Sequence, residues 1–206
     1  MHECLKDKAF YEGALTKEYW HIDNAKEIEN LPGGVTFSGG EALLQMEALV
    51  PVCRLLREEG VHIAVETCLF IPPKLLQLAI ENIDFFYCDI KILDEKKCKE
   101  SELGDINLFR SNLGILLKNN KPVVIRVPVI GKQTDTPENR AAVKELLNKY
   151  KEKILKIELI KEHNLGESKY KSLGMEMSYH GVDNETMELY KNELSELGIP
   201  IEICKI

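Results

Sequence analysis

The stretch "GGVTFSGGEALLQ", residues 33 to 45, places two glycine pairs around the strand-favouring run "VTFS" and ends in a glutamate that opens a predicted helix. β-Branched and aromatic residues favour a strand, whereas a glycine pair permits a turn or lets another group approach the backbone closely. A strand, a glycine turn and a helix in succession begin a parallel strand–helix unit. The second pair, Gly39 and Gly40, therefore marks a place where a ligand can reach the main chain.

The succession of strand and helix recurs along the chain. Apolar, β-branched runs predict strands over 34–38, 61–67, 85–92, 122–130, 154–160 and 199–205. Amphipathic segments predict helices over 41–60, 73–82, 107–120, 136–153 and 184–198. We expect Pro51 to interrupt or restart the first of these helices, because proline lacks the N–H that a helix interior needs.

Strict alternation of strand and helix predicts the α/β class, with parallel strands joined by right-handed crossovers. A closed barrel of eight such units typically needs about 250 residues, so 206 residues favour an open, partial TIM-type barrel, with a doubly wound sheet as the alternative. Residues 1–32 stand apart as a helical and polar segment, with a short helix in "CLKDKAFYEG" and no clear strand in "ALTKEYWHIDNAKEIENLP". Residues 33–206 form the predicted partial-barrel domain.

The composition excludes several classes of function. A net charge of -7 argues against a nonspecific binder of nucleic acid or of an anionic membrane. No apolar run is long enough to span a membrane and the N-terminus lacks the apolar core of a signal peptide, so we expect a cytoplasmic protein. The run "KILDEKKCKE" is predicted to be a solvated helix face. Six scattered cysteines without a CxxC pair fit neither a disulfide framework nor a zinc knuckle.

Polar residues gather where the predicted strands end. Parallel α/β folds bind ligands at the carboxyl ends of their strands, which here read "SGGE", "VETC", "CDIK", "IRVP" and "IKEHN". The residues predicted to share this rim are Ser38, Gly39, Gly40, Glu41, Glu66, Thr67, Asp89, Lys91, Arg126 and His163.

Each of these residues also has a purely structural explanation. The glycine turn can serve chain geometry alone. Asp89 and Lys91 lie two apart on a strand and can form an ion pair with each other. Arg126 needs an anion, which Glu66 can supply as well as a substrate. A lone His163 is more often a surface or core residue than a ligand. The coincidence of five such strand ends favours a binding site.

The chemistry of the rim suggests what it binds. Gly39 and Gly40 expose backbone groups that can receive an ammonium and carboxylate head, Lys91 and Arg126 supply positive charge, and His163 offers a flat face. An amino acid joined to a nucleoside matches this set. A nucleoside triphosphate or a dinucleotide fits poorly, because GxxxxGK[ST] and GxGxxG are both absent.

The chain resembles the radical S-adenosylmethionine enzymes, and within them the activating enzymes of glycyl radical enzymes, the group typified by pyruvate formate-lyase activating enzyme. The resemblance runs from about Leu5 to Cys204. The segments that carry it, in the family's order, are "LKDKAFYEG", "GGVTFSGGEALLQ", "GVHIAVETC", "YCDIKILD", "VIRVPVI" and "IELIKEHNLGESKYKSLGM".

The resemblance implies a role for each rim residue. The backbone of Ser38, Gly39, Gly40 and Glu41 would hold the amino group of S-adenosylmethionine, Lys91 its carboxylate, Arg126 the region of the ribose, and His163 the nucleoside. Glu66, Thr67 and Asp89, with the carbonyl of Tyr87, resemble a monovalent-cation site. Glu66 stands where the family's "DTxG" has Asp, and Leu69 stands where it has Gly.

One family motif is absent from this sequence. Relatives bind a [4Fe-4S] cluster through CxxxCxxC, no such run occurs here, and Cys4 cannot replace a triplet. In complete relatives the reduced cluster cleaves the cofactor, and the 5′-deoxyadenosyl radical takes hydrogen from a glycine of a partner enzyme. Our hypothesis is a fragment that holds part of the cofactor pocket, with the cluster supplied by a partner chain, or self-association through the open sheet edge. Residues 14–31 resemble an insertion.

Two other functions remain open. A Schiff-base lyase would use Lys91 as its nucleophile and Asp89 or Glu66 as a proton shuttle. A non-catalytic module would retain the S-adenosylmethionine pocket or the partner-docking surface without chemistry. The sequence does not name the glycyl radical enzyme that would be served.

Overall fold

The computed structural model describes residues 14–15, 31–32, 34–101, 104–161, 171–174 and 181–204. Its centre is a six-stranded parallel sheet whose strands follow the order of the sequence. These strands are β3 (Gly34–Phe37), β4 (His62–Thr67), β5 (Phe85–Asp89), β6 (Val123–Val129), β7 (Lys156–Lys161) and β8 (Ile201–Cys204). The helices between them are η1 (Ala42–Gln45), α4 (Met46–Glu58), α5 (Pro73–Asn82), α6 (Glu95–Ser101), α7 (Ile106–Lys118), α8 (Pro137–Asn148), η2 (Lys151–Lys153) and α10 (Asn184–Ser195).

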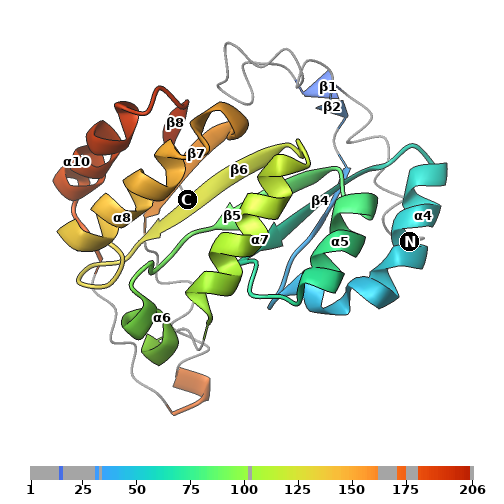
Figure 1. Cartoon of the computed structure of the whole chain (residues 1–206), viewed down its shortest axis with the longest axis horizontal. Coiled ribbons are helices and arrows are strands. Elements are labelled where there is room, and N and C mark those ends of the chain that lie inside the picture. Colours follow the sequence, from blue (N-terminus) through green and yellow to red (C-terminus); the bar gives the residue numbers. More distant parts are fainter. Residues whose placement is uncertain are drawn as a thin grey trace.

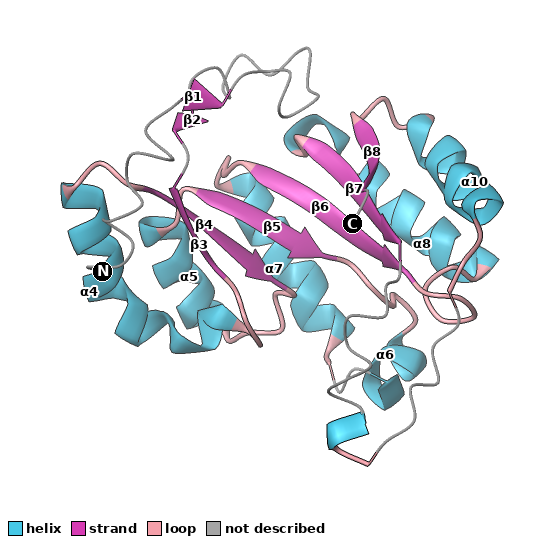
Figure 2. Ribbon diagram, turned by 180° about the vertical axis from the view of Figure 1, so that it is seen from behind, coloured by secondary structure: helices cyan, strands magenta, loops and turns pink. Residues whose placement is uncertain are grey.

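The order of the strands decides between the two predicted architectures. Each strand lies beside its predecessor in sequence, so the order never reverses, and the doubly wound alternative is wrong. Right-handed crossovers that all advance in one direction put the helices on one face of the sheet. Figure 1 shows α4, α5, α7, α8 and α10 on this face, and Figure 2 shows the opposite face of the strands from behind. The α/β class and the open partial barrel are confirmed.

The two faces of the sheet carry different residues. Alternate residues of each strand point toward the helices and form the apolar core, including Ile63, Phe86, Ile125, Ile157 and Leu159. The residues between them point to the opposite, inner face, which is strongly polar. Its charged residues, supplied by four neighbouring strands and the edge strand β8, are Glu66, Asp89, Arg126, Lys156, Glu158 and Glu202.

β3 lies unusually close to β4 at its first residue. A Cβ atom built on Gly34 would stand 1.9 Å from the carbonyl oxygen of His62. Only glycine permits this approach, because a backbone oxygen on a paired strand cannot move aside. The first glycine pair of the opening stretch thus serves strand packing rather than a ligand.

Most predicted elements are present within a few residues of their predicted bounds. All six predicted strands occur, and α5 has the predicted bounds. The prediction for Pro51 is wrong, because α4 continues through it. Its missing N–H leaves unpaired only the carbonyl of Glu47, an exposed residue that water can reach. The helix predicted in "KILDEKKCKE" is α6, whose residues 95–97 are exposed.

The N-terminal segment contains strands that the sequence reading missed. β1 (Ala14–Leu15) and β2 (Leu31–Pro32) pair antiparallel, with Ala14 opposite Pro32. Two-residue strands are too short to show an alternating pattern, which explains the miss. Their pairing brings the two ends of residues 14–32 together. The helix predicted in "CLKDKAFYEG" lies outside the described residues, and among the described helices none is long and apolar enough to cross a membrane.

Candidate functional site

The loop after β3 presents bare backbone at the carboxyl edge of the sheet. Gly39 has φ +129, a conformation that side chains rarely adopt, and a Cβ atom built on either Gly39 or Gly40 would meet no other atom within 4 Å. This is the opposite of the crowding at Gly34. The second glycine pair therefore borders open space, into which a ligand can bring a polar head close to the main chain.

Glu41 holds this loop in place through its side chain. Its carboxylate accepts hydrogen bonds from the Thr67 hydroxyl at 2.9 Å and from the Cys68 N–H at 2.8 Å, and it caps η1 by accepting from the Leu43 N–H at 3.2 Å. The carboxylate is thus directed toward the end of β4. What the loop offers to a ligand is the backbone beside Gly39 and Gly40.

Arg126 is the centre of an ion-pair network on the inner face. Its Nη1 lies 2.8 Å from Glu66 Oε1 and its Nε lies 2.9 Å from Asp89 Oδ1. Ser38 donates a hydrogen bond from its hydroxyl to the other oxygen of Glu66, and the ring of Tyr87 lies 5.4 Å from the guanidinium carbon. Residues from β3 to β6 thereby form one connected cluster.

Arg126 lies within β6 and not at its end, because β6 extends to Val129. The register explains how it still reaches the rim, since Arg126 is the direct neighbour of Asp89, the last residue of β5. Glu66 reaches the same guanidinium from β4. The longer arm of glutamate, compared with aspartate, suits this span, and it lets one carboxylate contact both Ser38 and Arg126.

The network changes the ionisation of its members. Burial opposes the charged form of Glu66, but hydrogen bonds from Arg126 and Ser38 outweigh it and hold the pKa of Glu66 below its usual value. Burial dominates at Asp89 and raises the pKa of that carboxyl, although Arg126 and Lys91 act against it. Burial also opposes the charge of Arg126, but Glu66 and Asp89 more than compensate and raise its pKa. The guanidinium remains charged and is strongly held.

Lys91 lies just beyond the end of β5 and is half-buried. It lines a small cavity together with Cys68, Phe70, Asp89, Ile92, Leu93, Ile106 and Phe109. Asp89 pairs with Arg126, and within the described part of the chain the ammonium of Lys91 has no hydrogen bond or ion pair. Lys91 is therefore a cation available to an anionic ligand at the carboxyl edge of the sheet.

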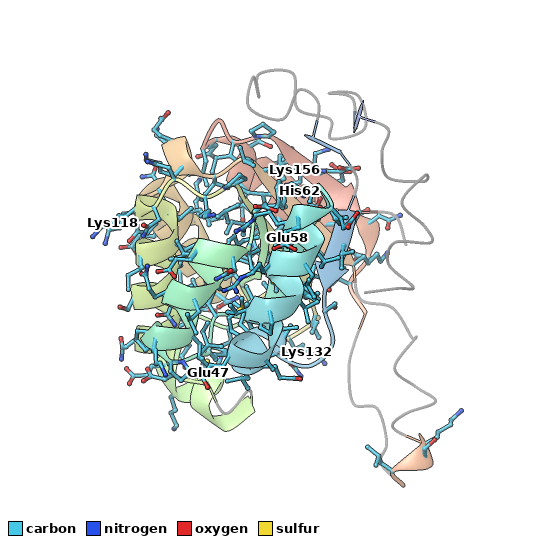
Figure 3. The ribbon with its side chains drawn as sticks, turned by 90° about the vertical axis from the view of Figure 1, so that its right-hand side faces the viewer. Glu47, Glu58, His62, Lys118, Lys132 and Lys156 are labelled. Atoms are coloured by element: carbon cyan, nitrogen blue, oxygen red, sulfur yellow. The ribbon has the colours of Figure 1, made fainter. Side chains whose placement is uncertain are left out.

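A second ionic cluster on the inner face was not singled out from the sequence. Lys156, whose side chain is only 5% exposed, lies 2.5 Å from Glu202 and 3.1 Å from Glu158. Lys156 and His62 are the first residues of their strands, and Figure 3 shows them at one end of the sheet, with Lys132 and Glu47 toward the other. This cluster lies away from the carboxyl edge. Alternation of charged and apolar residues in "KIELI" is the signal that could have revealed it.

Three predictions depend on what this structure describes. His163 lies outside the described residues. Glu66, Thr67, Tyr87 and Asp89 are neighbours, as a monovalent-cation site requires, but both carboxylates contact Arg126 and the Thr67 hydroxyl donates to Glu41. Among the described residues no group of three or more histidine, cysteine and acidic side chains is arranged to hold a metal ion.

Comparison with known proteins gives close relatives by sequence and by fold. The chain is 36% identical over 172 residues to the 4-hydroxyphenylacetate decarboxylase activating enzyme of Clostridioides difficile (strain CD196), covering 81% of this chain and 54% of that protein. It is 35% identical over 182 residues to the choline trimethylamine-lyase activating enzyme of Oleidesulfovibrio alaskensis, covering 86% of this chain and 59% of that protein. The chain thus spans little more than half the length of these relatives.

A solved structure matches over nearly its whole length. A domain of pyruvate-formate lyase-activating enzyme from Bacteroides vulgatus aligns with a TM-score of 0.71 at 22% identity, covering 84% of this chain and 99% of that one. At this identity the match establishes the fold. No protein-family model matches the chain.

Proposed function

We propose that this chain, a homologue of the activating enzymes of glycyl radical enzymes, binds S-adenosylmethionine across the carboxyl ends of β3, β5 and β6. One observation carries the proposal: the open backbone at Gly39 and Gly40 shares a sheet edge with the available ammonium of Lys91. A ligand with an amino group and a carboxylate on one carbon needs this combination of a bare main chain and a cation.

The described residues divide the cofactor between them. The backbone from Ser38 to Glu41 would accept the amino group of the methionine part, and Lys91 would pair with its carboxylate. Arg126 would lie beside the ribose, held in position by Glu66 and Asp89. His163, on the segment after β7, would contact the nucleoside.

The iron–sulfur cluster does not fit this chain's own residues. The cysteines among the described residues are free, three of them are buried, and no CxxxCxxC run occurs in the sequence. Bound S-adenosylmethionine supplies a 5′-deoxyadenosyl group once a reduced cluster donates an electron. We therefore propose that another chain provides the cluster, and that the resulting complex acts on a glycyl radical enzyme.

The proposed partner chain would dock on β3. Among the described strands, β3 has a neighbour on one edge only, namely β4. An unpaired edge can add a further parallel strand through backbone hydrogen bonds. A second copy of this chain is the alternative occupant, and a monomer at micromolar concentration in size-exclusion chromatography with light scattering would exclude self-association.

The proposed cation site competes with Arg126 for the same carboxylates. A monovalent cation bound by Glu66, Thr67, Asp89 and the carbonyl of Tyr87 requires the guanidinium to leave at least one carboxylate. Titrations of S-adenosylmethionine in potassium chloride and in choline chloride at equal ionic strength test this. Tighter binding in potassium supports the cation, and equal affinity argues against it.

Calorimetric titration of S-adenosylmethionine into the purified chain tests the main proposal. Lys91→Ala and Gly40→Val should both abolish specific binding, the first by removing the cation and the second by filling the open space. Lys97→Ala removes the same charge from an exposed position and should bind like the wild type. Binding unchanged in Lys91→Ala and Gly40→Val would refute the pocket, as would no binding by the wild type at millimolar ligand.

A Schiff-base lyase is the second candidate, favoured by the available ammonium of Lys91 beside Asp89, whose pKa burial raises toward that of a proton donor. Borohydride reduction with simple aldehydes and ketones, followed by mass spectrometry, tests it. An adduct on Lys91 that depends on the carbonyl compound supports this function, and no adduct across the series argues against it.

A further inference from the structure

Asn139 is a buried amide in the first turn of α8 that contacts two different loops. It is 5% exposed. Its Nδ2 donates hydrogen bonds to the carbonyls of Lys91 and Thr134, both at 2.9 Å, and its Oδ1 accepts from the N–H of Leu93 at 2.8 Å. Both donors of the amide are used, and its oxygen is used as well. Two carbonyls and one N–H around it dictate which way the amide faces.

These contacts join the segment after β5 to the segment after β6. Ile90 ends its pairing with β6 by donating its N–H to the Arg126 carbonyl at 2.8 Å. Asn139 then holds the next residues from both sides of Ile92, through the Lys91 carbonyl and the Leu93 N–H. The chain that carries Lys91 is thus kept against the strand that carries Arg126.

The anchor of this clamp is itself well ordered by hydrogen bonds. Thr134 is 1% exposed, and its hydroxyl accepts from the Ile130 N–H and donates to the Pro128 carbonyl, both at 2.7 Å. The N–H of Asn139 in turn donates to the Thr136 hydroxyl that caps α8. The loop after β6 is therefore a closed unit, and Asn139 transmits its position to Lys91.

We propose that Asn139 is a positioning residue for Lys91: it orients the backbone of Lys91 so that the ammonium faces the bound carboxylate. The inference rests on the proposed function, in which Lys91 receives the carboxylate of S-adenosylmethionine. A lysine side chain has several rotatable bonds, so the position of its backbone decides how much conformational freedom is lost when it binds a ligand. A loosened segment would keep the ammonium but lower its affinity for the carboxylate.

A purely structural role for Asn139 predicts a different result, and Asn112 provides the matched control. Asn112 is a fully buried amide of α7 that donates to the carbonyls of Leu69 and Ile71, at 2.9 Å and 2.8 Å, in the loop after β4. It performs the same kind of clamping on a loop without Lys91. If clamping matters only for stability, the two asparagines should affect cofactor binding alike.

The test is a double-mutant cycle read out by the dissociation constant for S-adenosylmethionine. We expect Asn139→Ala to weaken binding on the order of tenfold, and Asn112→Ala to leave it within about twofold, when both are assayed well below their unfolding midpoints. In a Lys91→Ala background, Asn139→Ala should cause no further loss. Asn139→Ser, which leaves a smaller void, serves if the alanine variant does not fold.

Each outcome separates this inference from the proposed function. Wild-type binding that is lost in Lys91→Ala but kept in Asn139→Ala and Asn139→Ser overturns the inference and leaves the proposed function intact. An equal loss from Asn139→Ala with and without Lys91 also overturns it, because the effect would then not pass through Lys91. No binding by the wild type overturns both.

Discussion

Glu41 should contribute to folding more than its position in a glycine-rich surface loop suggests. Replacing it with alanine removes the acceptor for the Cys68 N–H at 2.8 Å and for the Leu43 N–H at 3.2 Å. A hydrogen bond to a charged group is worth about 2 kcal/mol and a helix cap about 1 kcal/mol. We therefore expect Glu41→Ala to lower the free energy of unfolding by about 3 kcal/mol, a large part of the stability of a single domain.

Glu41→Gln should cost less, because one amide oxygen remains to accept from the Cys68 N–H. Urea denaturation followed by circular dichroism measures both variants, with an unchanged slope as the condition for comparing midpoints. Glu47→Ala is the control, since the ion pair of Glu47 with Lys74 is exposed and should contribute less than about 1 kcal/mol. A loss below about 1 kcal/mol for Glu41→Ala would refute the assignment of Glu41 as the loop's anchor.

Three further predictions concern stability, each measured by urea denaturation. Gly34→Ala should destabilise the fold by about 3 kcal/mol or unfold β3, because its Cβ meets the His62 oxygen, and a normal midpoint would contradict the close approach. Lys132→Gly should stabilise the protein by about 1 kcal/mol, because Lys132 has φ +63 in an exposed loop; Lys118→Gly, in a helix, should do the opposite. Burial disfavours the charge of Lys156, but its two glutamates outweigh this and raise its pKa. Its contribution is thus complete below pH 10.5 and lost as pH rises through the raised value, so Lys156→Met should differ from the wild type most at neutral pH and least at strongly alkaline pH, and a pH-independent difference would contradict this.

Local pattern was sufficient for the elements of the sheet and its helices. β-Branched runs and amphipathic periods recur strictly in turn, and the chain has little choice but to form parallel strands with helical crossovers. Pro51 was misjudged because its effect depends on exposure: a lost helical bond costs less where water reaches the carbonyl of Glu47.

The candidate site was predictable as a set of residues but not as a set of contacts. Strand-end polarity identified Lys91 and Arg126, because the carboxyl ends of parallel strands share one edge. The pairing of Arg126 with both Glu66 and Asp89 depends on the register of three strands, which residue type does not reveal. Asn139 was missed because an asparagine in the first turn of a helix after proline is usually a solvated residue.

The sequence by itself determined the fold class, the order of the elements and the family of the chain, because periodicity and local motifs are carried by residues close together in the chain. Only the tertiary structure decided what each polar group does. Crossovers in one direction placed the helices on one face and left the charged residues on the other. Which carboxylate binds a guanidinium, which glycine makes room for a strand and which for a ligand are settled by distances between residues far apart in sequence, since hydrogen bonds and steric contacts act only over a few ångströms.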